Sequence, residues 1–251
     1  MQTKKGVNMS NPTETVKLTA GNNFEIEDSD ANNANRFSLQ EIPYEVVSFE
    51  EGETLFKEGD TPKGLYLMKS GCVKLFVHRD RNRGRTTSPE YVTKLVSPGE
   101  VFGYKSLVFG QPNQAFAKAV RKTTVWIYAR ESVTKLLAVS HPIVKSILEQ
   151  AVSDIKSYEI TSQLHYLASV QERIAYQLVV LSDRFGVPSP RGGTSLNLKL
   201  TRNEFAQLAS TINESLSRHL TEFKAEGLID LNGKEIIILD RDGLAAKSGN
   251  F

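Results

Sequence analysis

The sequence of 251 residues contains a single cysteine, Cys72. One cysteine excludes an intrachain disulfide, and it cannot supply the several thiolates that hold an iron–sulfur cluster or a structural zinc ion. Cys72 lies in a stretch of alternating apolar residues, so we expect it to be a small residue of a core. We therefore predict no metal ligands and no iron–sulfur cluster.

Long apolar runs are also absent. The longest, residues 235–239 with their neighbours, is far shorter than the roughly 20 residues needed to cross a bilayer. No apolar stretch follows the first lysines, as it would in a signal peptide. We therefore expect a cytoplasmic protein without a membrane partner.

The short motifs that mark common enzymes are missing as well. There is no Walker motif, no nucleophile elbow, no His or Cys cluster with metal spacing, and no pair of carboxylates in a glycine-rich loop. We predict that the chain is not an enzyme and assign no catalytic residue. The formal net charge of +2 permits nucleic-acid binding without favouring it.

The N-terminal half changes character near residue 40. Residues 1–36 are rich in Asn, Thr, Ser, Asp and Glu and show no apolar period, which predicts a disordered tail. From residue 42 to about 128, short runs of alternating apolar residues are separated by Gly, Pro and Asp. Many short strands at this spacing are typical of an antiparallel sandwich or barrel, and we assign residues 37–140 to this β-domain.

After Pro142, about 25 residues have a helical pattern. Apolar residues recur there at alternating steps of four and three, as in the a/d seam of a coiled coil. These positions are Val144, Leu148, Ala151, Ile155 and Tyr158. The pattern predicts a dimerisation helix over residues 141–168, and the alternative is a single helix that lies on the β-domain.

Residues 169–245 form the predicted C-terminal domain. Its first helix runs from 170 to about 185, and a loop follows over 186–193. Thr201 and Glu204 then form a capping box, which opens a short helix. The domain therefore begins with one long and one short helix.

A second, amphipathic helix follows the short one after a turn over residues 209–212. Its apolar residues share one face: Ile212, Leu216, Leu220 and Phe223. Its polar residues share another: Glu214, Ser217, Arg218 and Thr221. Gly227 suits the C-terminal cap, and residues 228–239 predict two strands around a type I′ turn at Asn232 and Gly233. Helix, turn, helix and hairpin is the order of a winged helix-turn-helix.

At this point the residues resemble those of the CRP/FNR family, named after the cyclic-AMP receptor protein and the fumarate-nitrate reduction regulator. In the C-terminal half the match rests on ERIA at 172–175, LTR at 200–202 and ESLSR at 214–218, in the family's order and spacing. Glycine-punctuated runs over 51–71 and 97–103 match the β-region.

The resemblance covers roughly residues 44–244 and implies a fold and a function. The fold is α+β: an N-terminal antiparallel β-roll of the jelly-roll, cyclic nucleotide-binding type, a long dimerisation helix and a C-terminal winged helix-turn-helix. The function is that of a homodimeric, sequence-specific transcription regulator that binds double-stranded DNA at a near-palindromic site and works with RNA polymerase.

Three residues of the second helix have the chemistry of base readout. Arginine donates two hydrogen bonds to guanine, glutamate accepts one from cytosine, and serine is adaptable. Glu214, Ser217 and Arg218 fall within about one turn, so they can enter one major groove, and the resemblance implies that they read the bases. The alternative is an exposed helix with an ion pair between Glu214 and Arg218 and no role in DNA binding.

Further DNA contacts are expected around these three. The candidates are Asn213, Thr201, Arg202, His219 and Thr221. Since residues 211–226 carry more acidic than basic groups, we expect phosphate contacts from Lys199, Arg202, His219 and Lys234. The family often has glycine at the position of Ser210 and a capping Thr or Ser at that of Ile212, so Thr211 or Asn213 is expected to cap the helix instead.

The sensor domain departs from relatives that bind cyclic AMP. Those carry an Arg-Ser pair for the cyclic phosphate, and here Gln114 and Ala115 align with it. An amide and a methyl group cannot hold a phosphate as a guanidinium does, so we predict that the usual cyclic-AMP ligands are lost. We assign this degenerate effector pocket to Gly103, Tyr104, Lys105, Ser106, Gln114, Ala115, Ser157 and Tyr158.

The effector itself stays open. Lys105 and Arg121 could hold a cyclic nucleotide or dinucleotide of another shape, or there is no effector at all. Haem is conceivable because histidines exist, but no spacing points to it: His78, His141, His165 and His219. A further hypothesis belongs to a different functional class from a DNA-binding regulator. It is a protein-interaction module whose winged domain has lost DNA binding.

Overall fold

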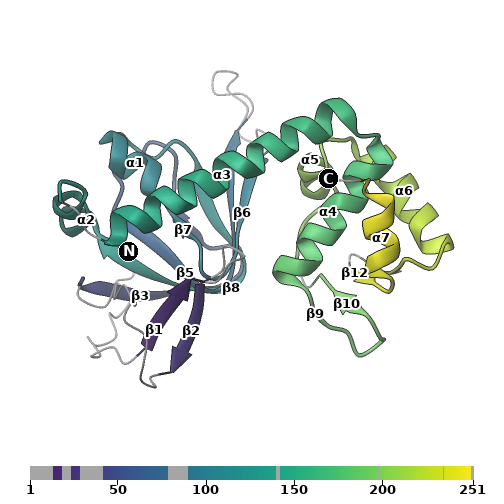
Figure 1. The fold of residues 1–251 in the computed structure, drawn as a ribbon, viewed down its shortest axis with the longest axis horizontal. Helices are drawn as coiled ribbons and strands as arrows, with labels where there is room; N and C mark the ends of the chain where they lie inside the picture. Colours follow the sequence, from purple (N-terminus) through teal and green to yellow (C-terminus); the bar gives the residue numbers. More distant parts are fainter. Residues whose placement is uncertain are drawn as a thin grey trace. The chain divides into compact units, whose positions relative to one another are not determined.

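The computed structural model describes residues 14–18, 24–28, 42–78, 90–139, 142–196, 198–233 and 235–249, the first two segments by their backbone. The chain forms two compact units (Figure 1). One consists of Met1–Val73 and Val96–Ser153, and the other of Lys74–Leu95 and Asp154–Phe251.

Two strands lie in the segment for which the sequence predicts no regular structure. Strands β1 (Glu14–Leu18) and β2 (Phe24–Asp28) pair antiparallel, so the prediction of disorder for 1–36 does not describe them. The rest of that predicted tail lies outside the described residues.

The β-region is the antiparallel sheet that the alternation predicts. Its strands are β3 (Tyr44–Phe49), β4 (Thr54–Phe56), β5 (Gly64–His78), β6 (Glu90–Val96), β7 (Val101–Phe102) and β8 (Phe116–Ala129). They are ordered β3-β8-β5-β6, with β4 also paired to β8 and β7 to β5. Gly71 has φ +100 where β5 passes β8, and a Cβ there would lie 2.6 Å from the Lys122 carbonyl oxygen, so only glycine fits.

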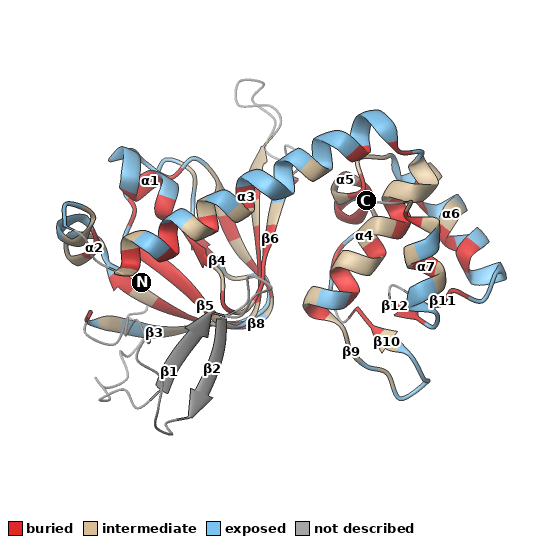
Figure 2. Ribbon diagram, viewed as in Figure 1, coloured by how far each residue is buried: buried red, intermediate tan, exposed pale blue. Residues whose placement is uncertain are grey.

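Three helices accompany this sheet: α1 (Tyr104–Phe109), α2 (Arg130–Leu137) and α3 (Pro142–Leu167). The first half of α3 buries Ile143 and Ile147 in the core formed by β5, β8, α1 and α2. Val144 and Ala151 pack against the same core, as the alternative of a helix lying on the β-domain requires. The adjacent face of α3 carries apolar residues that are exposed to solvent. Burial therefore differs between the two sides of the helix (Figure 2).

The second unit contains the helix-turn-helix. Its helices are α4 (Val170–Phe185), α5 (Arg202–Leu208), α6 (Asn213–Ala225) and α7 (Arg241–Lys247). A small sheet of order β11-β12-β10-β9 accompanies them, built from β9 (Val187–Pro188), β10 (Thr194–Ser195), β11 (Ile229–Asn232) and β12 (Glu235–Ile238). The chain is thus α+β, as predicted.

Two local predictions are corrected here. The segment predicted as a loop contains strand β9, which pairs with β10. In the wing, Asn232 pairs with Glu235 as the last strand residue, so the turn begins at Gly233 rather than at Asn232. Within the described ranges, no helix is long and apolar enough to cross a membrane.

Candidate nucleic-acid interface

Helix α6 is anchored by one apolar face. Leu216, Leu220 and Phe223 are almost completely buried, as their spacing predicts. At its C-terminus, Gly227 adopts φ +76, and the amide of Leu228 donates to the Phe223 carbonyl at 3.0 Å. This is a Schellman cap, which confirms the expected role of Gly227.

The N-terminus of α6 differs from the prediction. Ile212 itself is the N-cap, has an extended backbone and makes no side-chain capping bond. The expectation that Thr211 or Asn213 caps the helix is therefore wrong. Ile212 was also placed on the buried face, but it is 62% exposed, because its extended backbone takes its side chain off the helical face.

The polar face of α6 is open to solvent. Glu214, Ser217, Arg218 and Thr221 are all exposed, so the predicted separation of faces is confirmed. The Thr221 hydroxyl donates to the Ser217 carbonyl at 2.9 Å. Asn213 is exposed at the first turn of the helix. These side chains form a continuous polar surface on the helix.

Arg218 forms its ion pair on the side away from Glu214. Its Nε lies 3.9 Å from Oε1 of Glu222, one turn later, so the ion pair of the alternative interpretation, between Glu214 and Arg218, is not the one that the structure has. Exposed pairs of this kind contribute only about 0.3 to 0.5 kcal/mol. A bidentate contact with guanine discriminates by about 1 to 3 kcal/mol, so this pair is weaker than such a contact.

The turn between α5 and α6 is held by α4. The Arg173 guanidinium donates to the carbonyl oxygens of Ala209 at 3.2 Å, Ser210 at 3.1 Å and Ala168 at 2.8 Å. Ser210 has φ +49, a left-handed backbone that is strained for a residue with a side chain. Arg173 thus fixes the angle at which the chain enters α6.

Helix α5 begins at the predicted capping box. The Thr201 hydroxyl accepts from the Glu204 amide at 3.2 Å, and Glu204 Oε2 accepts from the Thr201 amide at 2.7 Å. The same hydroxyl donates to Glu204 at 2.9 Å. The hydroxyl of Thr201 is therefore engaged in the cap, and a DNA contact by this residue would draw on its backbone or methyl group.

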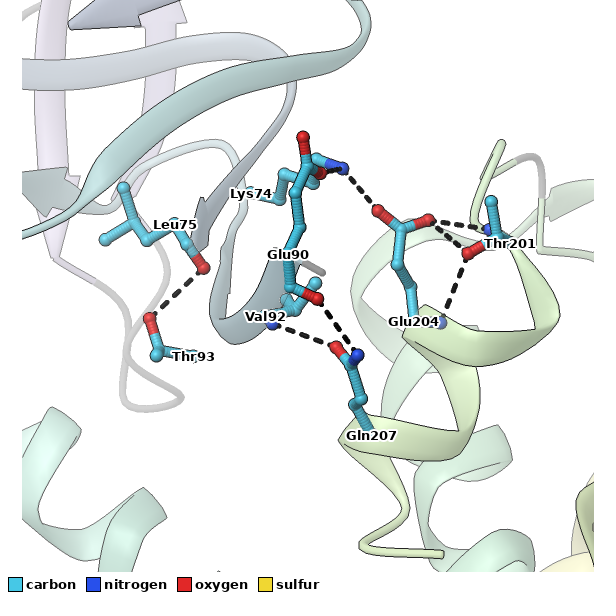
Figure 3. A network of polar contacts seen from close by, with 8 residues as sticks. All are labelled: Lys74, Leu75, Glu90, Val92, Thr93, Thr201, Glu204 and Gln207. Carbon is cyan, nitrogen blue, oxygen red and sulfur yellow. Dashed lines mark hydrogen bonds and ion pairs between the residues drawn. The ribbon is translucent and has the colours of Figure 1, made fainter. Parts of the chain in front are cut away.

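The second oxygen of Glu204 belongs to a buried ionic network (Figure 3). Lys74 of β5 pairs with both Glu204 and Glu90. Beside them, the Gln207 side chain of α5 accepts from the Val92 amide and donates to the Glu90 carbonyl, each at 3.0 Å. Side-chain and backbone bonds together fix α5 against Lys74–Leu95, the stretch of β5 and β6 that belongs to the second unit.

Burial and pairing act in opposite directions on this network. Burial alone would raise the pKa of Glu204, but hydrogen bonds from Lys74 and Thr201 outweigh it, and that pKa is lowered. Burial alone would lower the pKa of Lys74, but its bonds to Glu204 and Glu90 raise it. Both groups are therefore held in their charged forms.

The remaining candidate phosphate contacts vary in exposure. Lys199 is exposed, and Arg202 is half-buried with Nη2 donating to the Gly233 carbonyl at 3.4 Å. Burial lowers the pKa of Arg202. The His219 side chain is only 12% exposed, and Lys234 lies outside the described residues.

The structure brings part of the predicted effector pocket together. Gly103, with φ +80, is the N-cap of α1, on which Tyr104 and Ser106 are buried and Lys105 is exposed. The Ser106 carbonyl accepts from the amide of Gln111. Gln111 is the first residue of the loop that leads to Gln114.

Gln114 and Ala115, which align with the Arg-Ser pair of the relatives that bind cyclic AMP, offer few groups that could bind an anion. The Gln114 side chain is exposed and donates to the Gln111 side chain at 3.1 Å, and Ala115 is half-buried. Arg121 donates to the Gly71 carbonyl at 3.3 Å. Gln150 of α3, which the sequence did not single out, is buried and accepts from the Val101 amide at 3.2 Å, two residues before Gly103 of the predicted pocket.

Ser157 and Tyr158 belong to the second unit and are exposed there. Tyr158 lines a pocket of about 640 Å³ with Tyr91, His165 and Tyr166. Among the described residues, neither Lys nor Arg lines this pocket, so it does not suit a phosphate.

Two of the described histidines each contact a neighbouring side chain. His78 meets Phe76 edge-on, with ring centroids 5.6 Å apart, and His219 pairs with Glu222. His141 lies outside the described residues. No group of three or more His, Cys, Asp or Glu side chains within the described part of the chain could hold a metal ion.

Comparisons with known proteins assign both halves of the chain. The family model of a cyclic nucleotide-binding domain matches residues 46–140, and that of a Crp-like helix-turn-helix domain matches residues 172–247. The chain belongs to the CRP/FNR family of transcription regulators. It is therefore a regulator of the DNA-binding type.

Curated CRP/FNR relatives match along most of their length. The transcriptional activator protein FnrA of Stutzerimonas stutzeri is 29% identical over 217 residues, 84% of each chain. Electron transport regulator A of Shewanella oneidensis is 28% identical over 221 residues, 87% of this chain and 84% of that protein.

Solved structures agree on the fold. FixK2 from Bradyrhizobium japonicum superposes with a TM-score of 0.69 at 18% identity, covering 84% of this chain and 100% of that one. A CRP/FNR family regulator from Thermus thermophilus gives a TM-score of 0.67 at 23% identity, with 81% and 98% covered.

The CRP/FNR motif ERIA now has a structural explanation. Glu172 closes a capping box with Ser169, Arg173 holds the turn before α6, and Ile174 and Ala175 are fully buried. In the sequence this motif marks the family, and its spacing gives no sign of the positioning role of Arg173.

The left-handed Ser210 yields a first prediction. Ser210→Gly should raise the free energy of unfolding by up to about 1 kcal/mol, because glycine adopts φ +49 without strain. Urea-induced unfolding measures this change in the free energy of unfolding. Ser215→Gly in the interior of α6 is the matched control and should lower stability by several tenths of a kcal/mol. An equal decrease in stability in both variants would contradict the account.

Lys74 yields a second prediction. Lys74→Met should lower the free energy of unfolding by about 3 to 5 kcal/mol near neutral pH, because it leaves buried Glu204 without its cation. Lys122→Met removes an exposed pair with Glu50 and should cost less than about 1 kcal/mol.

The pH dependence of the Lys74 effect follows from the two pKa directions. The lowered pKa of Glu204 contributes stability above its ordinary value near 4.3, and this is lost as pH falls through the folded value. The raised pKa of Lys74 contributes below about 10.4, and this is lost as pH rises through the folded value. Urea titrations from acid to alkaline pH should therefore show the gap between wild type and Lys74→Met narrowing at both ends, and a constant gap would contradict the assignment.

Proposed function

We propose that this CRP/FNR regulator is a homodimer that binds a near-palindromic DNA site and places one α6 in the major groove of each half-site. Glu214, Ser217 and Arg218 read base edges. The observation that carries the proposal is the division of α6 into a buried apolar face and an exposed face that holds these three side chains.

An apolar stripe on α3 supports the homodimer. Leu148, Val152 and Ile155 follow one another at steps of four and three and are 57 to 62% exposed. They lie beside the face of α3 that packs on the β-domain core. The apolar residues of the predicted a/d seam therefore have two roles: some pack on the β-domain, and others would pair with a second copy. A second copy of α3 would cover the stripe and set the half-sites about one helical turn apart.

Phosphate contacts would come from groups flanking α6. Lys199 and Arg202 supply charge, and Asn213, Thr221 and the backbone of Thr201 supply hydrogen-bonding groups near the same surface. His219 would act through Glu222 and Arg218 rather than on a phosphate. The protein would act in the cytoplasm with RNA polymerase as a partner, and it would not be an enzyme.

The sensor domain would have lost the usual cyclic-AMP ligands. The exposure of Gln114, its bond within its own loop and the methyl group of Ala115 support this loss. A cyclic dinucleotide or other anion bound near exposed Lys105 is the alternative, and so is regulation without an effector.

Sequence selection from a random DNA library tests the DNA-binding proposal. Wild type should enrich an inverted repeat, and Arg218→Ala should weaken binding to it by about 1 to 3 kcal/mol for each base that the variant no longer reads. Arg191→Ala is the matched control, since Arg191 is similarly exposed but lies between β9 and β10. Failure to enrich any repeat, with or without cyclic mono- and dinucleotides, would favour the protein-interaction module.

Sedimentation tests the homodimer. Ile155→Asp should dissociate it, because a charge on the apolar stripe would be buried without a partner. Ser157→Asp adds the same charge to another exposed face of α3 and should leave the dimer intact. A wild-type monomer, or equal dissociation by both variants, would overturn this part of the proposal.

A further inference from the structure

A polar cluster lies on α6 immediately beside the proposed base-reading face. Glu222 follows Arg218 by four residues and His219 by three, so the three side chains meet on one side of the helix. Glu222 Oε2 lies 2.7 Å from His219 Nδ1, and Glu222 Oε1 lies 3.9 Å from Arg218 Nε. The ring closes through Arg218 Nη2, which lies 3.4 Å from His219 Nε2.

Burial decides which member of the cluster is fixed. The His219 side chain is 12% exposed, that of Glu222 45% and that of Arg218 66%. The largely buried imidazole therefore positions the carboxylate, and the carboxylate positions the guanidinium. A guanidinium has five N–H donors, so the contact with Glu222 leaves donors free for a base.

The carboxylate also changes which DNA group Arg218 favours. A guanidinium binds phosphate as readily as a guanine edge, but phosphate contacts carry no direct sequence information. A negative charge held next to the guanidinium opposes the approach of a phosphate and does not oppose an uncharged base edge to the same degree. Holding Arg218 in place also reduces the conformational freedom that binding removes.

We propose that Glu222 is a positioning residue that determines specificity: fixed by His219, it directs Arg218 to a guanine and away from phosphates. The inference rests on the proposed function of Arg218 as a base reader. Glu222 needs no DNA contact of its own for this role.

The test compares Glu222→Gln with wild type on three DNAs at one salt concentration. These are the enriched site, the site with its base pair changed where Arg218→Ala loses discrimination, and unrelated DNA. Discrimination at that base pair should fall about twofold, as expected for the loss of an exposed pair, and binding to unrelated DNA should tighten. Glu226→Gln makes the same charge change on a residue that pairs with Lys247, and should leave discrimination unchanged.

Two further variants separate geometry from charge. Glu222→Asp keeps the charge on a shorter side chain, and should reduce discrimination without tightening binding to unrelated DNA. In the Arg218→Ala background, Glu222→Gln should have no effect on discrimination, because Glu222 acts through Arg218. Circular dichroism of each variant checks that the helices are retained.

The outcomes divide clearly. Unchanged discrimination in both Glu222 variants, an equal effect of Glu226→Gln, or an effect that persists without Arg218 overturns this inference alone. A wild-type protein that enriches no DNA site overturns the proposed function, and this inference with it.

Discussion

The orientation of the helix-turn-helix depends on the hydrogen bonds of one guanidinium. Arg173 of α4 satisfies the carbonyl oxygens of Ala209 and Ser210, at the point where the chain passes through a left-handed residue. Without it, these two carbonyls of a half-buried turn would need other donors. Because α6 starts directly after this turn, Arg173 holds the point at which the helix begins, and the buried side chains of Leu216, Leu220 and Phe223 determine which of its faces points to solvent.

A second constraint acts on α5. Buried Lys74 neutralises Glu204, whose other oxygen closes the capping box with Thr201. The cap and the ion pair thus share one carboxylate, and the bonds of Gln207 to the β6 backbone lie one turn further along the helix. The two helices of the motif are held in different ways: α5 by buried polar bonds, and α6 by an apolar face and the turn before it.

Elements that begin with a local sequence signal, such as a proline or a capping box, could be predicted from the sequence. Pro142 and the capping box of Thr201 gave the starts of α3 and α5 correctly, and alternation gave the sheet. The start of α6 lacked such a signal, because Ile212 caps it with backbone alone. The short strands β9 and β10 were not predictable, since two residues carry no period and their pairing depends on distant β12.

For the candidate site, periodicity predicted the exposed face of α6 but not the partner of Arg218. Glu214 and Glu222 both lie four residues from Arg218, and Arg218 pairs with Glu222, which also contacts His219. Periodicity also could not separate the two roles of α3, since Val144 and Ala151 face the core while Leu148 and Ile155 continue the same apolar pattern in solvent. The roles of these residues in binding DNA and a second copy stay predictions.

Methylation interference on the enriched DNA site tests direct readout by α6 most directly. A methyl group on guanine N7 removes the acceptor that a bidentate arginine needs. The account predicts one guanine in each half-site whose N7 methylation blocks wild-type binding and does not further weaken the Arg218→Ala variant. Binding that is indifferent to N7 methylation at every guanine, or equally sensitive in both proteins, would contradict it.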